Sequence, residues 1–302
     1  IAWSGNVFCA VGDAMVTMTW TERANPKNVA LNDVAWSGNI FAAVGNSDGG
    51  GAYILTSPDG TTWTEHGNAR NLPLYGIAWS SELALFCAVG SQGTPTLVDV
   101  YAYILTSPDG LTWTSHLAYW IGELYGGALY DIAWNGTVFC AVGGSTDGIP
   151  QSLSRVATST DGVTWTARLL SENRPYLYGV KWSATLGLFV AVGDASATAN
   201  TSILTSPDGI TWTGRASPKN FALFDVTWSA DKSLFIAVGA ADGTDAYLIT
   251  STDGITWTER ANPKNFALNS VIWTGKQFIA CGAADSTDAY IITSLDGITW
   301  AE

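Results

Sequence analysis

Tryptophan recurs along this chain in two fixed registers, and this periodicity constrains the fold more than any other feature of the sequence. The first register has seven members, which are Trp3, Trp36, Trp79, Trp134, Trp182, Trp228 and Trp273. The second also has seven, which are Trp20, Trp63, Trp113, Trp165, Trp212, Trp257 and Trp300. Only Trp120 of the 15 tryptophans lies outside both. Each step of the second register is about 47 residues, which is within the range of propeller blades.

Each repeat contains four segments with strand character. In the second repeat these are residues 32–36, 40–44, 52–56 and 62–65. The second segment is apolar without alternation, as in a strand covered on both faces, whereas the fourth alternates like a half-exposed outer strand. We therefore predict an all-β chain that forms one seven-bladed β-propeller of four-stranded antiparallel blades. An open β-solenoid is the alternative, but its repeats would be shorter and more uniform.

The predicted propeller is a single domain over residues 1–302, and its first blade is reduced. Only eight residues separate Gly12 from Trp20, whereas eighteen separate Gly45 from Trp63 in the next repeat. Blades 1 and 7 would then meet without sharing a strand. The approximate limits of the seven predicted blades are residues 1–28, 29–71, 72–124, 125–174, 175–220, 221–265 and 266–302.

A tight turn joins the third and fourth segments in six of the repeats, as in the run from Ser57 to Trp63. Its Asp can accept backbone N–H groups across the turn, and its Gly tolerates a positive φ. This S-x-D-G-x-T-W pattern resembles the Asp box, or bacterial neuraminidase repeat, of sialidases, sortilin-like receptors and propeller-type photosystem II assembly factors. The resemblance implies a propeller in which these carboxylates are structural and lie away from any catalytic face. They are Asp59, Asp109, Asp161, Asp208, Asp253 and Asp296.

The residues that a sialidase would need are missing. The resemblance would require an arginine triad, a Tyr–Glu pair and an acid Asp, beginning with an F-R-I-P-like segment. The sole Arg-Pro pair is Arg174-Pro175, in another context. Most other candidate acid–base groups share one position, three residues after a second-register Trp. Equivalent positions on successive blades are separated by the blade spacing, so these side chains cannot converge on one substrate. They are Arg23, His66, His116, Arg168, Arg215 and Arg260. We read them as ion-pairing or capping residues, and we expect no catalytic residue and no enzyme.

The cysteines and the paired acids also have simple structural explanations. Cys9, Cys87 and Cys140 share one position of the second segment and Cys281 lies two residues further on, so they are too far apart for disulfides. We expect buried, reduced thiols. No His/Cys cluster has zinc spacing. We read Asp242, Asp245, Asp285 and Asp288 as polar turn residues rather than as a calcium site, and we expect no metal or cofactor.

The charge balance excludes two classes of partner. There are 13 basic and 26 acidic residues, for a net charge of −13, whereas nucleic acids and anionic membranes select clustered Lys and Arg. No apolar run reaches about 18 residues, so we expect no membrane insertion. The chain opens on Ile1 without a signal-peptide pattern. The compartment therefore stays open, with an extracellular, virion or cell-surface location favoured over the cytoplasm, and we expect a monomer.

Irregular loops form the first candidate ligand region. Propellers bind ligands on the face that carries the second-to-third-strand loops and the blade connections. Here the loop after Gly90 and the loop from residue 144 to residue 155 are long, and residues 118–125 form an insertion. Its Trp120, with Tyr101, Tyr119 and Tyr125, could form a platform for a sugar or a peptide. The alternative is that the insertion only packs over blades 3 and 4.

The start of the first segment is the second candidate region. Three residues before each first-register Trp, blades 2 to 7 carry Asp33, Gly76, Asp131, Gly179, Asp225 and Ser270. The residues just upstream are Asn32, Tyr75, Tyr130, Tyr178, Phe224 and Asn269. We predict an acidic, aromatic-rimmed mouth that could take a cation, an amine or sugar hydroxyls. The alternative is that Asp only caps the strand starts. On the first reading, Asp131→Ala weakens a channel ligand and leaves folding intact.

Three functions are compatible with these patterns. The first is a non-catalytic propeller that binds a glycan or a protein through its loop-rich face, which suits a chain with only 13% charged residues. The second is a divergent glycoside hydrolase or lyase with acids in the central mouth. The third is a structural or assembly scaffold, in a larger particle or as one domain of a longer chain.

Overall fold

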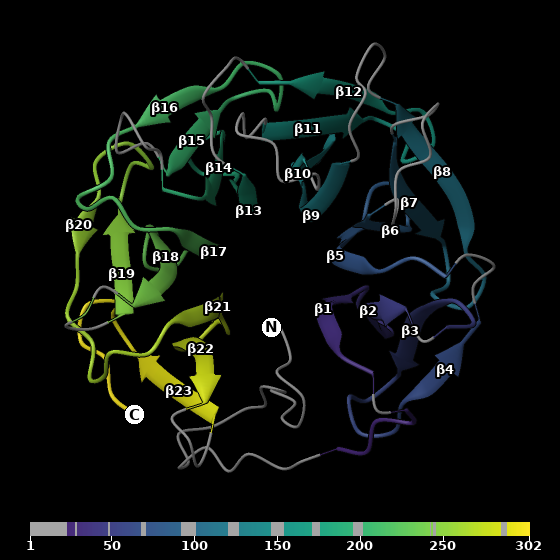
Figure 1. Cartoon of the computed structure of the whole chain (residues 1–302), viewed down its shortest axis with the longest axis horizontal. Helices are drawn as coiled ribbons and strands as arrows, with labels where there is room; N and C mark the ends of the chain where they lie inside the picture. The colour runs from purple at the N-terminus through teal and green to yellow at the C-terminus, as the bar shows by residue number, and fades with distance from the viewer. Residues whose placement is uncertain are drawn as a thin grey trace.

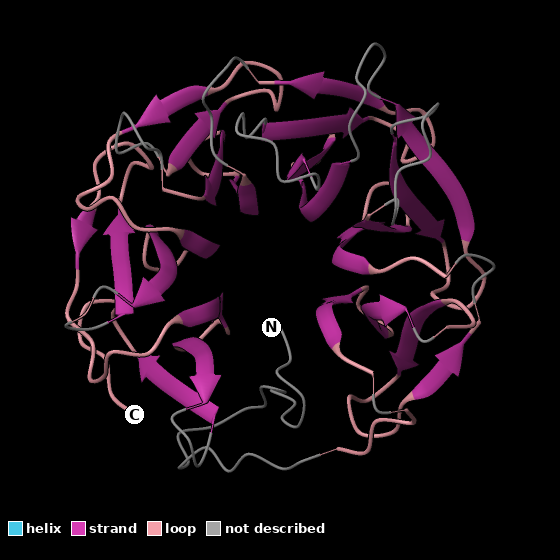
Figure 2. Cartoon of the chain, viewed as in Figure 1, coloured by secondary structure: helices cyan, strands magenta, loops and turns pink. Residues whose placement is uncertain are grey.

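Six β-sheets stand in a ring around a common axis in the computed structural model (Figure 1). The structure describes residues 23–302 except residues 28, 48, 68–70, 92–100, 120–126, 146–153, 171–175, 196–201, 242, 244–245 and 285–288. Every regular element within this part of the chain is a strand (Figure 2). The sheets correspond to repeats 2–7 of the sequence, and we keep these numbers for the blades.

The first three blades are each formed by four consecutive strands. Blade 2 contains β1 (Leu31–Trp36), β2 (Phe41–Ser47), β3 (Ala52–Ser57) and β4 (Thr64–His66). Blade 3 contains β5 (Leu74–Ser80), β6 (Leu85–Gly90), β7 (Tyr101–Ser107) and β8 (Thr114–Tyr119). Blade 4 contains β9 (Gly127–Trp134), β10 (Phe139–Ser145), β11 (Ser154–Ser159) and β12 (Thr166–Leu169).

The other three blades follow the same order. Blade 5 contains β13 (Leu177–Ser183), β14 (Leu188–Gly193), β15 (Ile203–Ser206) and β16 (Thr213–Arg215). Blade 6 contains β17 (Leu223–Ser229), β18 (Leu234–Ala241), β19 (Ala246–Ser251) and β20 (Thr258–Glu259). Blade 7 contains β21 (Leu268–Trp273), β22 (Phe278–Ala284) and β23 (Ala289–Ser294), and an isolated bridge joins Thr293 to Ala301 in place of a fourth strand. In every blade the first strand lies nearest the axis (Figure 1).

The blade count is lower than the sequence analysis predicted. Six blades are present in the described residues instead of seven, and the last has three strands instead of four. The reduced first blade, expected over residues 1–28, falls almost wholly outside the described residues. The Trp register alone implied that this unit forms a blade, yet its sequence lacks the third-to-fourth-strand turn that the other six repeats share. The all-β propeller of antiparallel blades is confirmed.

Each blade is filled by a phenylalanine held between its two tryptophans. In blade 4 the ring centroids of Trp134 and Phe139 lie 4.4 Å apart, and those of Phe139 and Trp165 lie 6.3 Å apart. Phe139 is completely buried. The same contacts recur in the other five blades, around Phe41, Phe86, Phe189, Phe235 and Phe278. The tryptophan registers are therefore the two outer members of one aromatic stack per blade.

The S-x-D-G-x-T-W turns close the blades on the face opposite the inner-strand starts. In blade 3, Asp109 Oδ1 accepts the backbone N–H groups of Leu111 at 2.8 Å and Thr112 at 2.9 Å. These hydrogen bonds hold the pKa of Asp109 below its usual value. Trp113 Nε1 donates to the carbonyl of Gly110 at 2.9 Å. The same bonds recur in all six turns, at Asp59, Asp109, Asp161, Asp208, Asp253 and Asp296. These carboxylates thus serve the turn itself.

The repeated cation position is also structural, and five of its residues contact a threonine hydroxyl on the neighbouring strand. His116 Nε2 lies 2.8 Å from the hydroxyl of Thr106 on the neighbouring strand, and Arg260 Nε donates to Thr250 at 2.9 Å. Equivalent threonine contacts are made by His66, Arg168 and Arg215. The described cysteines, Cys87, Cys140 and Cys281, are free thiols whose pKa burial raises.

Near the end of the second strand of each blade stands a glycine, because another backbone passes against it. A Cβ on Gly239 would lie 2.0 Å from the carbonyl oxygen of Ala222. The conflicting atom belongs to the main chain, so no side-chain rotation relieves the clash. The same restriction applies to Gly45, Gly90, Gly143, Gly193 and Gly282.

Gly239→Ala is therefore expected to destabilise the protein by about 2 kcal/mol or more, because the added methyl must push two strands apart. Gly67→Ala is the matched control, since a Cβ there meets nothing within 4 Å and φ is not positive. Urea unfolding followed by tryptophan fluorescence gives both midpoints. Equal midpoints for the two variants would show that the strands yield easily at Gly239.

Candidate functional site

Each inner strand contains a β-bulge at the same place. In blade 6, Leu223 pairs with Gly239 and Asp225 pairs with Val238, so that Phe224 is skipped. The same shift occurs in the other five inner strands. A bulge breaks the strict alternation of side chains, so two successive residues can reach the same space. The skipped residues are Asn32, Tyr75, Tyr130, Tyr178, Phe224 and Asn269.

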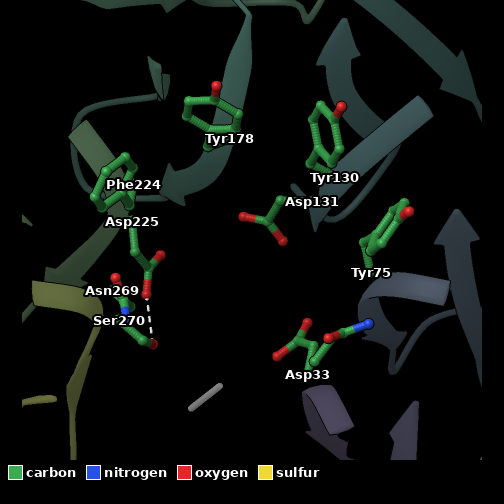
Figure 3. Close-up of a pocket in the computed structure, with 10 residues that line it drawn as sticks. Asp33, Tyr75, Tyr130, Asp131, Tyr178, Phe224, Asp225, Asn269 and Ser270 are labelled. Atoms are coloured by element: carbon green, nitrogen blue, oxygen red, sulfur yellow. Dashed lines mark hydrogen bonds between the residues drawn. The ribbon is translucent and has the colours of Figure 1, made fainter. Parts of the chain in front are cut away.

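The bulges surround a pocket at the mouth of the propeller axis. It has a volume of about 140 Å³ and is lined by the six skipped residues together with Asp33, Asp131, Asp225 and Ser270 (Figure 3). Inner strands begin here, and second strands end beside them. The pocket therefore opens on the face that carries the second-to-third-strand loops. The structure thus brings together the predicted mouth residues, and ligand binding by them stays a prediction.

Four aromatic rings form a continuous arc over blades 3 to 6. The ring centroids of Tyr75 and Tyr130 lie 5.4 Å apart, those of Tyr130 and Tyr178 5.6 Å, and those of Tyr178 and Phe224 6.0 Å. All three pairs are tilted or edge-to-face, which is a favourable arrangement for aromatic rings. Below, "the arc" means these four residues. Blades 2 and 7 contribute Asn32 and Asn269 instead, so the arc covers one side of the mouth.

Residues at the ends of second strands fix parts of this rim. The hydroxyl of Tyr178 donates to Asp194 Oδ1 at 3.0 Å, and Asn32 Nδ2 donates to Asn46 Oδ1 at 3.0 Å. Asn46 and Asp194 each follow the recurring glycine of the second strand, Gly45 and Gly193, and the sequence patterns did not predict a role for them. Their equivalent positions in the repeat were the signal that could have found them. Burial raises the pKa of Tyr130 to about 12, so its hydroxyl stays neutral at physiological pH.

The three carboxylates hold neighbouring blades together. Asp131 Oδ1 accepts the N–H of Ile132 on its own strand at 2.7 Å, and its Oδ2 accepts the N–H of Val180 in blade 5 at 2.7 Å. Asp33 and Asp225 make the same pair of contacts, with Oδ2 accepting from blades 3 and 7 respectively. Asp225 also accepts the hydroxyl of Ser270 at 2.7 Å. These residues therefore do more than cap the start of their own strands.

The small residues between the acids are explained by close approach of the next blade. A Cβ on Gly76 would lie 2.8 Å from Cα of Asp131, and one on Gly179 would lie 3.1 Å from Cα of Asp225. Acid-bearing blades 2, 4 and 6 therefore alternate with blades that must be small at this position. The Asp and Gly alternation in the sequence is a consequence of packing around a narrow axis.

Acids are the titratable charged groups that line the mouth. Burial, together with the nearby carboxylates of Asp33 and Asp225, raises the pKa of Asp131 to about 8, while the bond from Val180 opposes the shift. Burial also raises the pKa of Asp33. None of the ten residues that line the pocket is Lys, Arg or His. At neutral pH the mouth therefore holds a bound proton at Asp131.

The loop-platform prediction remains open. Trp120 and Tyr125 lie outside the described residues, as do Asp242, Asp245, Asp285 and Asp288. Tyr101 and Tyr119 pair directly across β7 and β8, but their side chains are not among those described. Within the described part of the chain, no group of three or more His, Cys, Asp or Glu side chains is arranged to hold a metal ion. No helix long and apolar enough to cross a membrane is found there either.

Comparison with known proteins supports the fold. No protein-family model matches the chain, and no curated protein matches it. A solved structure titled "Crystal structure of Nidogen/Laminin Complex" contains a similar propeller, with a TM-score of 0.56 and 13% sequence identity. The match covers 87% of this chain and 92% of that chain. At this identity the likeness concerns the architecture alone.

The raised pKa of Asp131 predicts a specific titration. The carboxyl carbon of Asp131 should titrate near pH 8 in a ¹³C NMR experiment on aspartate-labelled protein. Asp109, whose pKa is lowered, should titrate below about pH 4 and serves as the internal reference. Because the folded state then holds a proton that the unfolded state has lost, this group makes the free energy of unfolding decrease as the pH rises from about 4 to about 8. Titration of Asp131 below pH 5 would contradict the electrostatics described here.

The inter-blade hydrogen bonds change the expectation for Asp131→Ala. The substitution removes the acceptor of both the Ile132 and the Val180 N–H groups, so we now expect a loss of about 1–3 kcal/mol of stability rather than intact folding. Tyr130→Phe, at the adjacent position, keeps the ring of the arc and should be nearly neutral. Chemical denaturation of both variants measures the difference. An Asp131→Ala protein as stable as the wild type would show that the carboxylate does not join the blades.

Proposed function

We propose that this chain is a non-catalytic binding protein that recognises a glycan or a protein ligand through the face that contains the channel mouth. The observation that carries the proposal is the convergence of four aromatic rings and three carboxylates on one open pocket. Bulges in six separate strands are needed to produce it. Aromatic rings offer flat contact area to sugars and to side chains, and carboxylates accept hydrogen bonds from either.

The surroundings of the pocket favour recognition of a large ligand. The second-to-third-strand loops leave the blades on this same face, and loops on a rigid scaffold are common recognition elements. A pocket of about 140 Å³ holds one group of a ligand, while the loops around it can contact the remainder. The similar propeller belongs to a structure whose title names a complex of two proteins, which supports a protein as the ligand. A monomeric state remains a prediction.

The carboxylates are better suited to binding than to catalysis. Both oxygens of Asp33, Asp131 and Asp225 accept backbone N–H groups, which fixes their positions and joins them to the blades. A divergent glycoside hydrolase is nevertheless the second candidate. The specific observation in its favour is Asp131, whose pKa of about 8 would keep it protonated as a general acid beside another carboxylate.

We also propose that the chain is related to the Asp-box propellers. Support comes from the six turns in which Asp Oδ1 accepts two successive backbone N–H groups and the Trp indole donates to the Gly carbonyl. This relationship concerns the scaffold. It leaves open a purely structural or assembly role, which the experiment below separates from binding.

The experiment is a binding screen with defined glycan and peptide arrays, using labelled wild type, Tyr130→Leu and Trp120→Ala. We expect the wild type to bind members of one array, and Tyr130→Leu to lose at least about tenfold in affinity because it removes the centre of the arc. Tyr130→Phe is the control that keeps the ring.

Each outcome bears on the proposal. Loss of binding in Trp120→Ala alone would move the site to the insertion over residues 118–125. Hydrolysis of a bound glycan would favour the hydrolase. Absence of binding on both arrays would contradict the proposal and favour the scaffold.

A further inference from the structure

We infer that the mouth is a site for an alkylammonium group, and that a lysine side chain of a protein ligand carries this group. The inference rests on the proposed function and makes it more specific, because it names the chemistry recognised by the pocket and selects protein over glycan. Two independent properties of the pocket point to it, namely the arc of aromatic rings and the three acids that line the same space.

The arc provides the surface that an organic cation prefers. Ammonium groups are attracted to the negative faces of aromatic rings, most strongly where water is partly excluded. Four rings from adjacent blades line one pocket here, and each lies within 6.0 Å of the next, measured between centroids. Neutral tyrosines suit this role, and burial raises the pKa of Tyr75, Tyr130 and Tyr178.

The carboxylates provide charge that the lining does not balance. Each oxygen of Asp33, Asp131 and Asp225 accepts one backbone N–H, and Asp225 Oδ2 also accepts the hydroxyl of Ser270. A carboxylate oxygen has two lone pairs, so an oxygen that accepts a single N–H can accept a further hydrogen bond. Figure 3 shows the three carboxyl groups facing a shared central space. The ten lining residues include no cationic side chain. A ligand cation would add countercharge at the point where the three acids converge.

The chain already holds ammonium groups in this way on its outer surface. Lys264 Nζ lies 5.7 Å from the ring centroid of Tyr290 and pairs with Glu302. Lys27 Nζ lies 5.9 Å from the ring centroid of Tyr53 and pairs with Glu65. Both sites combine a tyrosine face with a carboxylate. The mouth offers the same two partners in greater number, without a lysine of its own in the lining.

Other ligands fit the mouth less well. Within the described residues no group of three or more His, Cys, Asp or Glu side chains is arranged to hold a metal ion. A neutral sugar can stack on the arc, but it brings no positive charge to the acids. An alkylammonium group satisfies both halves of the pocket at once.

The proton held at the mouth makes cation binding dependent on pH. A cation favours ionised Asp131, so the affinity should rise as the pH increases through about 8, and the bound proton is released on binding. The charged groups that influence Asp131 are Asp33 and Asp225, which raise its pKa, and the exposed Lys181, which lowers it. Tyr75, Tyr130 and Tyr178 line the same pocket, and Asp131 in turn raises the pKa of Cys140. The pKa values of the tyrosines and of Cys140 are raised, so these groups stay neutral over the same range.

The test uses choline, whose quaternary ammonium does not titrate, and 3,3-dimethylbutan-1-ol, its neutral isostere. Both are titrated into the full chain by NMR, with the mouth residues as reporters. We expect choline to bind and the alcohol not to bind. The affinity for choline should be at least about fivefold higher at pH 9 than at pH 6, as expected when ionised Asp131 is the binding form.

Three variants place the binding at the mouth. Tyr130→Leu should lose at least about tenfold in choline affinity, while Tyr130→Phe, which keeps the aromatic face, should retain it. Glu302→Gln removes one negative charge from an exposed ion pair of blade 7, away from the mouth. It should leave the choline affinity and its pH dependence unchanged. On the peptide array, replacement of the ligand's lysine by norleucine should abolish binding that depends on Tyr130.

Several results would overturn the inference. Equal binding of choline and the alcohol would show that charge plays no part. If calcium chloride shifted the NMR signals of the mouth residues and choline did not bind, the mouth would be a metal site. Glycan binding that depends on Tyr130, without choline binding, would overturn the ammonium inference and leave the proposed function standing. Loss of all array binding would instead remove the proposed function.

Discussion

The closeness of the inner strands around the axis governs the rest of this structure. Neighbouring blades meet there with so little space that a Cβ on Gly76 would lie 2.8 Å from the backbone of the next blade. Where one blade is small, the adjacent one can carry a carboxylate that reaches the following strand, as Asp131 reaches the N–H of Val180 at 2.7 Å. Carboxylate hydrogen bonds join blade 2 to 3, 4 to 5 and 6 to 7. Close backbone approach at a glycine occurs between blades 3 and 4 and between blades 5 and 6. The two kinds of contact therefore alternate from blade to blade.

The candidate site is a consequence of this arrangement. Holding three carboxylates close to one axis stabilises the blade contacts through backbone N–H groups, but it also concentrates like charges in a partly buried space. The structure reduces this repulsion by keeping the proton of Asp131 to about pH 8. The energetic cost of the mouth and its capacity to attract a cation thus have one cause.

The sequence predicted the features that repeat along the chain. It did not predict the features that depend on strand register or on hydrogen bonds between blades. The two tryptophan registers predicted antiparallel blades, and the equivalent positions of Asp33, Asp131 and Asp225 predicted that they meet at one mouth. The bulges could not be predicted, because they depend on which residue of the second strand faces Leu223 or Asp225. The acceptor role across blades was missed for the same reason, since the N–H of Val180 is 49 positions away from Asp131. The predicted count of seven was too high for the described residues, which form six blades. The repeat at residues 1–28, whose sequence lacks the closing turn, lies almost wholly outside them.

The two halves of the mouth differ in symmetry, and this difference has a functional meaning. The acids lie on blades 2, 4 and 6, whereas the aromatic rings occupy blades 3 to 6 and give way to Asn32 and Asn269 on blades 2 and 7. On the inference made above, acids on alternate blades would attract a cation from more than one side. A one-sided arc would add a preferred direction, because the apolar part of the ligand gains contact on the aromatic side. Orientation and attraction would then be separate properties of this site, supplied by the skipped residues of the bulges and by the acids that follow three of them.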